Sequence, residues 1–381
     1  MSDDFVISFE APQPVHDALK RIGRIEDASF SPDNRRLALA CLGRNSVAIA
    51  DVTMNGAAER PHVAVTGVTE YSSPHLMTPH GADFLDDETI IVANREGNVV
   101  AFRLPPNGSG GDGAALTPID TPPGNGFELL HAPGSIAIIR APGAPVEVLV
   151  CDNRKSTVTR HTLEDDSFGV TSNDILLRRL LDFPDSVAVT DDNHWIAISN
   201  HDAHVVLLYR RTSPLSEDSD PACLLRGTMY PHGLRFSTDG RHLLVADAGR
   251  PYVQVYRRDG EDWHGVQYPQ ASLRVMGDDI FALGRDDESR GPKGIAIDRQ
   301  GRVLTVTYEN QPLAFFDVAA MLEHADGRDP DQTLRLSYEL EALEEATARR
   351  EESIARLMGS TSFRVTAPLR RLNAAWSKRR R

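Results

Sequence analysis

The repeating unit of this chain is clearest in Pro231–Tyr256, which reads PHGLRFSTDGRHLLVADAGRPYVQVY. It begins with an alternating apolar run, passes through a polar turn at Ser237–Gly240, and continues into a second run, Leu243–Ala246. That second run ends at Asp247, and after a short turn a third run starts at Tyr252. Short apolar runs separated by tight polar turns are typical of antiparallel strands.

The same unit occurs six times along the chain, at intervals of 47 to 61 residues. Its first runs are Ile25–Phe30, Pro79–Phe84, Pro133–Ile138, Pro184–Val189, Pro231–Phe236 and Pro292–Ile297. Four of the second runs end in an Asn or Asp, whose side chain can bond backbone groups of a nearby turn. These residues are Asn94, Asp152, Asn200 and Asp247.

A unit of three or four short strands that repeats in this way predicts a β-propeller. We expect an all-β fold with six four-stranded antiparallel blades in residues 1–330, followed by a helical, basic tail in residues 331–381. A βαβ fold is excluded because no helical period separates the strands. We expect Phe5–Phe9 to supply the outer strand of the last blade, with Thr333–Tyr338 as the alternative donor.

The residue just before each inner strand is expected to face the mouth of the central channel. In chain order these residues are Glu26, His80, Gly134, Asp185, His232 and Lys293. Because blades three apart face each other, Glu26 should oppose Asp185 and His80 should oppose His232. Two imidazoles, two carboxylates and one amine would then share one small space. We therefore predict that Glu26, His80, Asp185, His232 and Lys293 bind a ligand there.

Two His and one or two carboxylates are a plausible set of ligands for one divalent transition metal. Glu26, His80, Asp185 and His232 are the candidate metal ligands, and such a metal could activate water. Lys293 is the candidate catalytic residue, because its ammonium could stabilise developing negative charge. The alternative is a hydrated structural ring with no bound metal.

The repeat resembles the six-bladed propellers that include the NHL-repeat proteins and the gluconolactonase-like (SMP-30) group, over most of residues 20–320. In the lactonase-like group a Glu before the first inner strand holds a divalent metal, together with an Asn and an Asp from later blades. Glu26 and Asp185 match two of these places, whereas Gly134 stands where the Asn is expected. The resemblance implies a propeller fold and a lactonase-like reaction as one candidate activity.

Composition excludes several other classes of protein. The chain carries 41 Lys and Arg against 55 Asp and Glu, a net charge of −14, which disfavours nucleic-acid binding. We find neither a long apolar run nor a signal peptide, so we expect no membrane span and no secretion. Three widely spaced Cys, without a C-x-x-C pair, favour a reducing compartment and hence the cytoplasm.

The C-terminal tail has a different pattern. Leu336, Leu340, Leu343, Ile354 and Leu357 follow a helical spacing that predicts a helix over 339–358 and admits a short coiled coil. Residues 361–381 contain seven basic residues and no acid, so we expect this segment to contact anionic membrane peripherally. Gly359–Leu372 resembles a short tail of bacterial glycosyltransferases from surface-polysaccharide clusters, which implies a setting and no catalytic residue.

Two functions follow from these observations. The first is a non-catalytic propeller that binds a protein partner or a small molecule at the channel mouth, in bacterial surface-polysaccharide assembly. The second is a metal-dependent hydrolase or lactonase-like enzyme that uses the same channel residues.

Overall fold

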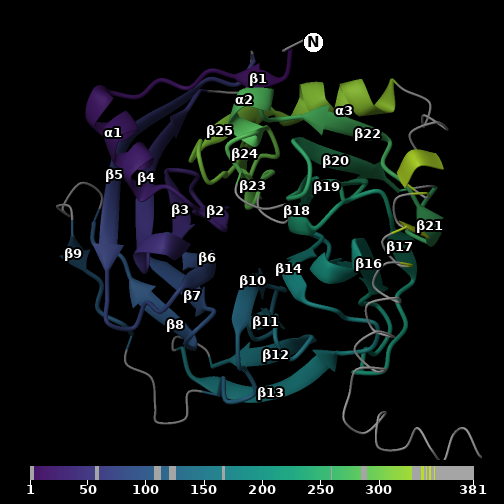
Figure 1. Ribbon diagram of the computed structural model, residues 1–381. Coiled ribbons are helices and arrows are strands. Elements are labelled where there is room, and N and C mark those ends of the chain that lie inside the picture. The colour runs from purple at the N-terminus through teal and green to yellow at the C-terminus, as the bar shows by residue number, and fades with distance from the viewer. Residues whose placement is uncertain are drawn as a thin grey trace, which may run out of the picture. The chain divides into compact units, whose positions relative to one another are not determined.

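The structure is a computed structural model that describes residues 4–55, 60–106, 113–119, 126–164, 168–258, 260–284 and 290–327, and residues 336–338, 340, 343, 344 and 347 beyond them. Its contacts divide the chain into two compact units, Met1–Asp331 and Gln332–Arg381. The first unit is a ring of six β-sheets around a central axis (Figure 1). This arrangement confirms the predicted six-bladed propeller.

Each blade runs from the axis outwards. The inner strands are β2 (Ala28–Phe30), β6 (Pro79–Asp86), β10 (Pro133–Ile139), β14 (Pro184–Val189), β18 (Pro231–Phe236) and β23 (Ile295–Ile297). The second strands are β3 (Arg36–Cys41), β7 (Thr89–Asn94), β11 (Glu147–Asp152), β15 (Trp195–Asn200), β19 (His242–Asp247) and β24 (Val303–Val306). The third strands are β4 (Ser46–Met54), β8 (Val99–Arg103), β12 (Thr157–Leu163), β16 (Val205–Arg210), β20 (Tyr252–Arg257) and β25 (Ala314–Asp317). All of these neighbours pair antiparallel.

The outer strands vary more than the repeat predicts. Those that belong to their own blade are β5 (Val63–Ser72), β13 (Val170–Leu177), β17 (Cys223–Leu225) and β22 (Ala271–Arg274). Two short strands, β9 (Ala114–Ala115) and β21 (Gly265–Gln267), instead pair parallel with the preceding blade. Within the described residues the sheets therefore contain three to five strands, and three of the six have the expected four.

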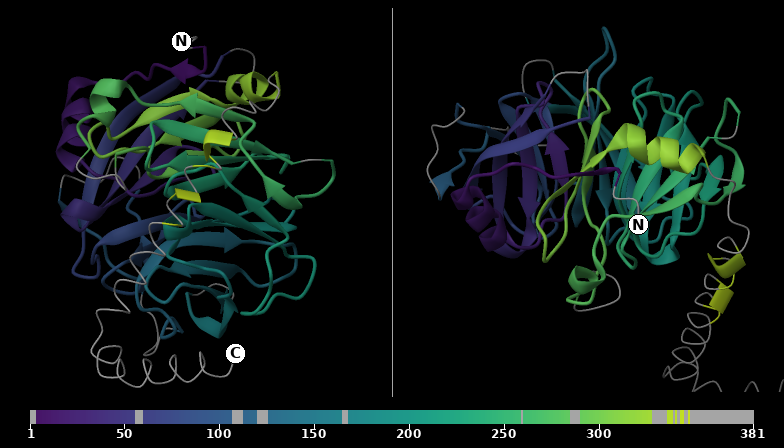
Figure 2. Two further views of the ribbon diagram at one scale, coloured as in Figure 1. Left: turned by 45° about the vertical axis from the view of Figure 1, so that its right-hand side comes forward. Right: turned by 90° about the horizontal axis from the view of Figure 1, so that it is seen from above.

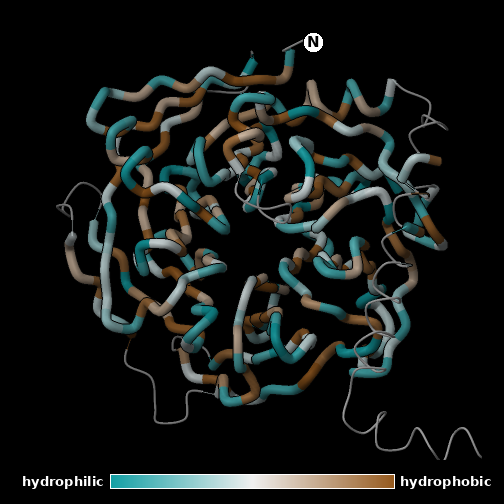
Figure 3. Tube along the Cα trace, viewed as in Figure 1, coloured by the Kyte–Doolittle hydropathy of each residue, from teal (hydrophilic) through white to brown (hydrophobic). Residues whose placement is uncertain are grey.

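The hydrophobic core lies between neighbouring blades. Six clusters of buried apolar side chains each join residues from two adjacent sheets. For example, Ala38 and Val47 of the first blade pack in one cluster with Phe84 and Phe102 of the second. Because both faces of a blade are covered in this way, its middle strands are apolar at successive positions. In Figure 3 the backbone around the central opening is more hydrophilic than these strands.

The N-terminus closes the ring. Strand β1 (Val6–Ile7) pairs antiparallel with β25, with Val6 opposite Phe316 and Ile7 opposite Phe315. Phe5 and Ile7 are buried, whereas Val6 is 39% exposed. The expectation that Phe5–Phe9 supplies the outer strand of the last blade is confirmed.

Three α-helices accompany the sheets in the part of the propeller that the structure describes, and the repeat predicts none of them. Helix α1 (Gln13–Ile22) packs Val15, Leu19 and Ile22 on the cluster between the last and first blades. Helix α2 (Asp278–Phe281) is a single turn, and α3 (Val318–Asp326) follows β25 along the side of the ring (Figure 2). The Asp317 side chain accepts a hydrogen bond from the Ala320 backbone N–H and thereby begins α3.

In the second unit the described residues are helical, including four within the predicted helix over 339–358. The Thr347 hydroxyl donates to the Leu343 carbonyl at 2.8 Å, one helical turn away. No helix among the described residues is both long and apolar enough to cross a membrane. The predicted membrane contact of 361–381 and the polysaccharide-type tail at 359–372 lie outside the described residues and stay predictions.

Candidate functional site at the channel mouth

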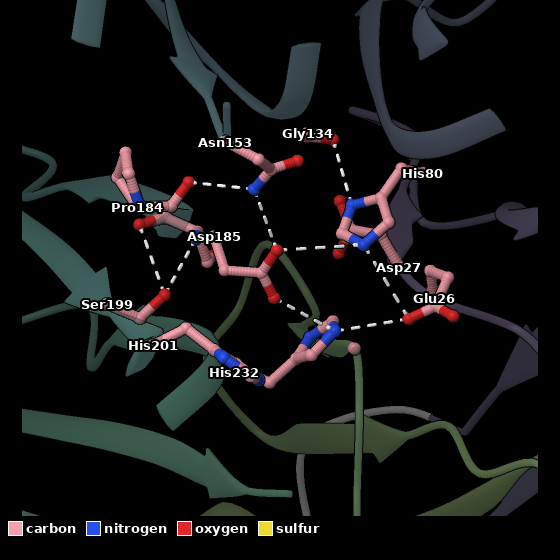
Figure 4. A network of polar contacts seen from close by, with 12 residues as sticks. Glu26, Asp27, His80, Gly134, Asn153, Pro184, Asp185, Ser199, His201 and His232 are labelled. Atoms are coloured by element: carbon pink, nitrogen blue, oxygen red, sulfur yellow. Dashed lines mark hydrogen bonds and ion pairs between the residues drawn. The ribbon is translucent and has the colours of Figure 1, made fainter. Parts of the chain in front are cut away.

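The six predicted channel-mouth residues lie at one end of the channel: Glu26 and Lys293 come just before their inner strands, and the other four are the second residues of theirs. Five of them are the predicted ligand-binding residues, and Figure 4 shows four of these pointing toward one another. All five side chains are almost completely buried: Glu26, His80, Asp185, His232 and Lys293. We call them the channel ring. Gly134 lies at the same level and offers its backbone carbonyl.

A repeated hydrogen bond places the ring residues. The Asn or Asp that ends a second strand accepts a hydrogen bond from a backbone N–H three positions before a channel-mouth residue (His80, Gly134, Asp185 or His232). These N–H groups belong to Met77, His131, Asp182 and Met229, and the acceptors are Asn94, Asp152, Asn200 and Asp247. The turn chemistry expected of these four side chains is therefore present, and it fixes the loop that leads into the channel.

Two glycines let the inner strands approach closely just after the ring. A Cβ added at Gly81 would lie 2.4 Å from the backbone oxygen of Gly134, and one at Gly233 would lie 2.7 Å from the backbone oxygen of Lys293. Both contacts are with backbone atoms, which cannot move aside cheaply. The Pro-His-Gly sequence thus combines a ring histidine with the small residue that brings the blades together.

His232 bridges the two carboxylates of the ring. Its Nε2 lies 3.1 Å from Glu26 Oε2 and 3.0 Å from Asp185 Oδ2. Although burial alone would lower the pKa of His232, Asp185 and Glu26 raise it above its usual value. Burial alone would raise the pKa of Glu26, but Lys293 and His232 hold it well below its usual range. The two ionised carboxylates therefore favour the imidazolium form of His232.

His80 has the opposite character. Its Nδ1 donates to the Gly134 carbonyl at 3.2 Å, so its Nε2 carries the lone pair. The Arg95 guanidinium donates to that Nε2 at 2.5 Å and to Asp185 Oδ1 at 3.2 Å. Burial, assisted by the charge of Arg95, lowers the pKa of His80 to about 3. His80 is therefore neutral, and its imidazole ring lies 5.5 Å from that of His232.

Lys293 is the fifth ring residue. Burial lowers the pKa of its ammonium, while the Glu26 carboxylate acts in the opposite direction. The Arg24 guanidinium donates a short hydrogen bond to Glu26 Oε1. Each buried carboxylate is thus compensated by more than one cation of the protein itself.

Arg24, Arg95 and Asn153 are part of this network, and our sequence analysis did not select them. The Asn153 amide donates to Asp185 Oδ1 at 3.0 Å and to the Pro184 carbonyl at 2.9 Å. Arg95 and Asn153 each directly follow the Asn or Asp that ends a second strand. This position could have been found from the sequence, because the side chain of the preceding Asn or Asp fixes the turn and so holds the next residue near the channel mouth.

A small cavity separates the ring side chains. Its volume is about 10 Å³, roughly the space of one water molecule. Ser135 lines it, and the Ser135 hydroxyl has no hydrogen-bond partner among the described residues. A single small species is what this space can hold.

A metal ion is one such species, and the donor geometry partly fits it. One oxygen or nitrogen atom each from Glu26, His80 and His232 lies within 4.8 Å of the others. Donor atoms around a tetrahedral metal lie roughly 3.3–3.6 Å apart. The charges oppose a metal, however. To bind one, His232 would have to lose a proton, and Arg95 would have to give up its hydrogen bond to the lone pair of His80.

Comparisons with known proteins support no family assignment. No protein-family model matches the chain, and no curated protein matches its sequence. Among solved structures, the β-propeller domain of Cps50 (Swd1) from Myceliophteria thermophila is similar over 77% of this chain and 83% of that chain. The identity is 11% and the TM-score is 0.44. The fold therefore rests on the strand pairing above, and the NHL-like and gluconolactonase-like resemblance stays a prediction.

Proposed function

We propose that this protein is a non-catalytic propeller that binds a protein partner or a small ligand at the channel mouth. The observation that carries the proposal is that the ring is already neutralised by the protein's own side chains. Four basic side chains, those of Arg24, Arg95, His232 and Lys293, act on the carboxylates of Glu26 and Asp185. The cavity of about 10 Å³ leaves no space for an organic substrate beside them.

The groups that a bound molecule would meet are the arginines. The side chains of Arg24 and Arg95 are 31% and 22% exposed, whereas the carboxylates beneath them are buried. The Arg95 guanidinium is held in place by the Asp185 carboxylate, so its remaining N–H donors are oriented before binding. A partner that presents carbonyl or carboxylate groups suits such a surface.

The second candidate is the metal-dependent hydrolase, favoured by the convergence of Glu26, His80 and His232. These residues and Asp185 would hold the ion, which would supply a Lewis acid and an activated water. Lys293, buried beside Glu26, would stabilise negative charge that develops on a substrate.

Metal content separates the two candidates. We expect full-length protein that has been reloaded with Zn²⁺ or Mn²⁺ to hold well below one equivalent of metal by elemental mass spectrometry. Arg95→Met should hold more, because the lone pair of His80 becomes accessible. The opposite result would favour the hydrolase. In that case the wild type holds one equivalent of metal, His80→Ala/His232→Ala loses it, and the exposed-histidine control His62→Ala/His194→Ala keeps it.

We further propose that the protein works in the cytoplasm in bacterial surface-polysaccharide assembly, with residues 361–381 as a peripheral membrane tether. The support is the basic tail and its sequence resemblance. Full-length protein should cosediment with anionic lipid vesicles at low salt and less at high salt, because basic side chains are attracted to anionic headgroups. The truncated chain 1–358 should stay in the supernatant. If neither chain sediments at low salt, the tether is wrong.

A further inference from the structure

The far end of the channel holds a second and larger cavity. Its volume is about 270 Å³. The channel ring lies where the inner strands begin, whereas this cavity is lined by residues two or more positions later, such as Ser29, Asp83 and Ala296. The two sites therefore lie one after the other along the channel. The size is just below the usual range for sites that bind small organic molecules, about 300–1,000 Å³.

Three arginines from three blades line this cavity: Arg140, Arg235 and Arg299. Each guanidinium is anchored by backbone carbonyls. Arg299 Nη2 donates to the Phe30 carbonyl at 2.7 Å, and Arg235 Nη1 donates to the Leu234 carbonyl at 2.8 Å. Arg140 Nη2 donates a short hydrogen bond to the Leu85 carbonyl. A carbonyl fixes the orientation of a guanidinium without cancelling its charge.

The acids around the cavity compensate these cations only in part. The Asp298 carboxylate accepts from the backbone N–H groups of Arg302 and Val303, both at 2.6 Å, within its own turn. Asp83 accepts from the Ser29 hydroxyl at 2.6 Å and lies 3.8 Å from Arg299. Arg235 Nη2 lies 3.4 Å from Oδ1 of the buried Asp27, which lines the small cavity of the channel ring, so this cation already has a carboxylate partner.

Arg140 and Arg299 are the two cations left to act on a bound molecule. Burial lowers the pKa of Arg140, the Asp83 carboxylate acts in the opposite direction, and the positive charge of Arg299 lowers it again. Two guanidiniums that repel each other across a cavity are stabilised when an anion enters between them. Asp191, at the rim, offers a carboxylate that can accept hydrogen bonds from hydroxyl groups.

We propose that this cavity binds a small hydroxylated organic anion, whose phosphate or carboxylate group lies between Arg140 and Arg299 and whose hydroxyl groups face Asp191. The site is separate from the channel ring and does not depend on the function proposed there.

The test uses three probes with the same sugar ring and different charge: glucose 6-phosphate, glucuronate and glucose. Binding to full-length protein is measured by isothermal titration calorimetry at low salt. We expect at least one of the two anions to bind at least tenfold more tightly than glucose, with an affinity that falls as salt rises. Whichever anion binds identifies the acidic group.

Variants assign the binding to the two arginines. Arg299→Met and Arg140→Met should each weaken binding of the anion at least tenfold, and Arg299→Lys should weaken it less. Arg103→Met, which removes an exposed arginine outside the cavity, is the matched control and should bind as the wild type does. Thermal melting of each variant shows whether it folds. If Arg140→Met does not fold, the comparison of Arg299→Lys with the wild type still tests whether a guanidinium binds the anion.

Two results would overturn the proposal. One is that neither anion binds better than glucose. The other is that a folded Arg299→Met protein binds the anion as tightly as the Arg103→Met control.

Discussion

Replacing Ile7 by aspartate is expected to lower the free energy of unfolding by about 3–5 kcal/mol, because it places a carboxylate among apolar side chains. Ile7 is only 6% exposed and belongs to the cluster between the last and first blades. The substitution also weakens the pairing of β1 with β25, which closes the ring. A released β1 leaves β25 as an open sheet edge, so we also expect aggregation.

The matched control is the neighbouring residue. Val6 lies on the same strand with its side chain on the opposite face, 39% exposed. Val6→Asp should change the free energy of unfolding by less than about 1 kcal/mol. Denaturant titration and light scattering on both variants give the answer. Equal losses in the two variants would show that β1 does not depend on which side chain faces the core.

Replacing Asp185 by asparagine should destabilise the propeller by a similar amount, about 3–5 kcal/mol, because it breaks a buried ionic network from one side. Asp185 Oδ1 accepts from Arg95 and Asn153, and Oδ2 faces His232. An amide supplies only one acceptor oxygen, so its NH₂ group must face a donor. The variant also leaves the imidazolium of His232 with a single carboxylate.

Asp174→Asn is the control for this effect. Asp174 also pairs with an arginine, at 2.9 Å from Arg160, but its side chain is 46% exposed. A solvated ion pair contributes about 0–1 kcal/mol, so this variant should melt close to the wild type. If Asp185→Asn melted at the same temperature as Asp174→Asn, the channel ring would be a hydrated feature that the fold does not need.

The sequence predicts the blades well because the unit recurs six times. A single apolar run after a Pro-His-Gly does not identify a fold, whereas six apolar runs at similar intervals are compatible with few folds other than a propeller. The convergence of Glu26, His80, Asp185 and His232 follows from the same register, since equivalent positions in a ring of blades must meet at the axis. Their roles as metal ligands or ligand-binding residues stay predictions.

The features that were missed depend on contacts beyond the repeat. Arg95 reaches His80 within its own blade and Asp185 two blades away, and no local pattern specifies such a reach. Strands β9 and β21 pair with the preceding blade, which depends on loop path and not on alternation. Helix α1 did leave a signal, because Val15, Leu19 and Ile22 have helical spacing behind a proline-rich start.

Closure of the ring by β1 also sets an order of events during synthesis. Val6 is made before the six blades, and its partner Phe316 is made near the end of the propeller. At about 5–20 residues per second, roughly 15–60 s separate the two strands. During that interval the nascent chain is an open arc with Phe5 and Ile7 still exposed to water. A ribosome that stalls before Ala314 therefore holds a chain whose ring cannot close, because β1 has no partner strand.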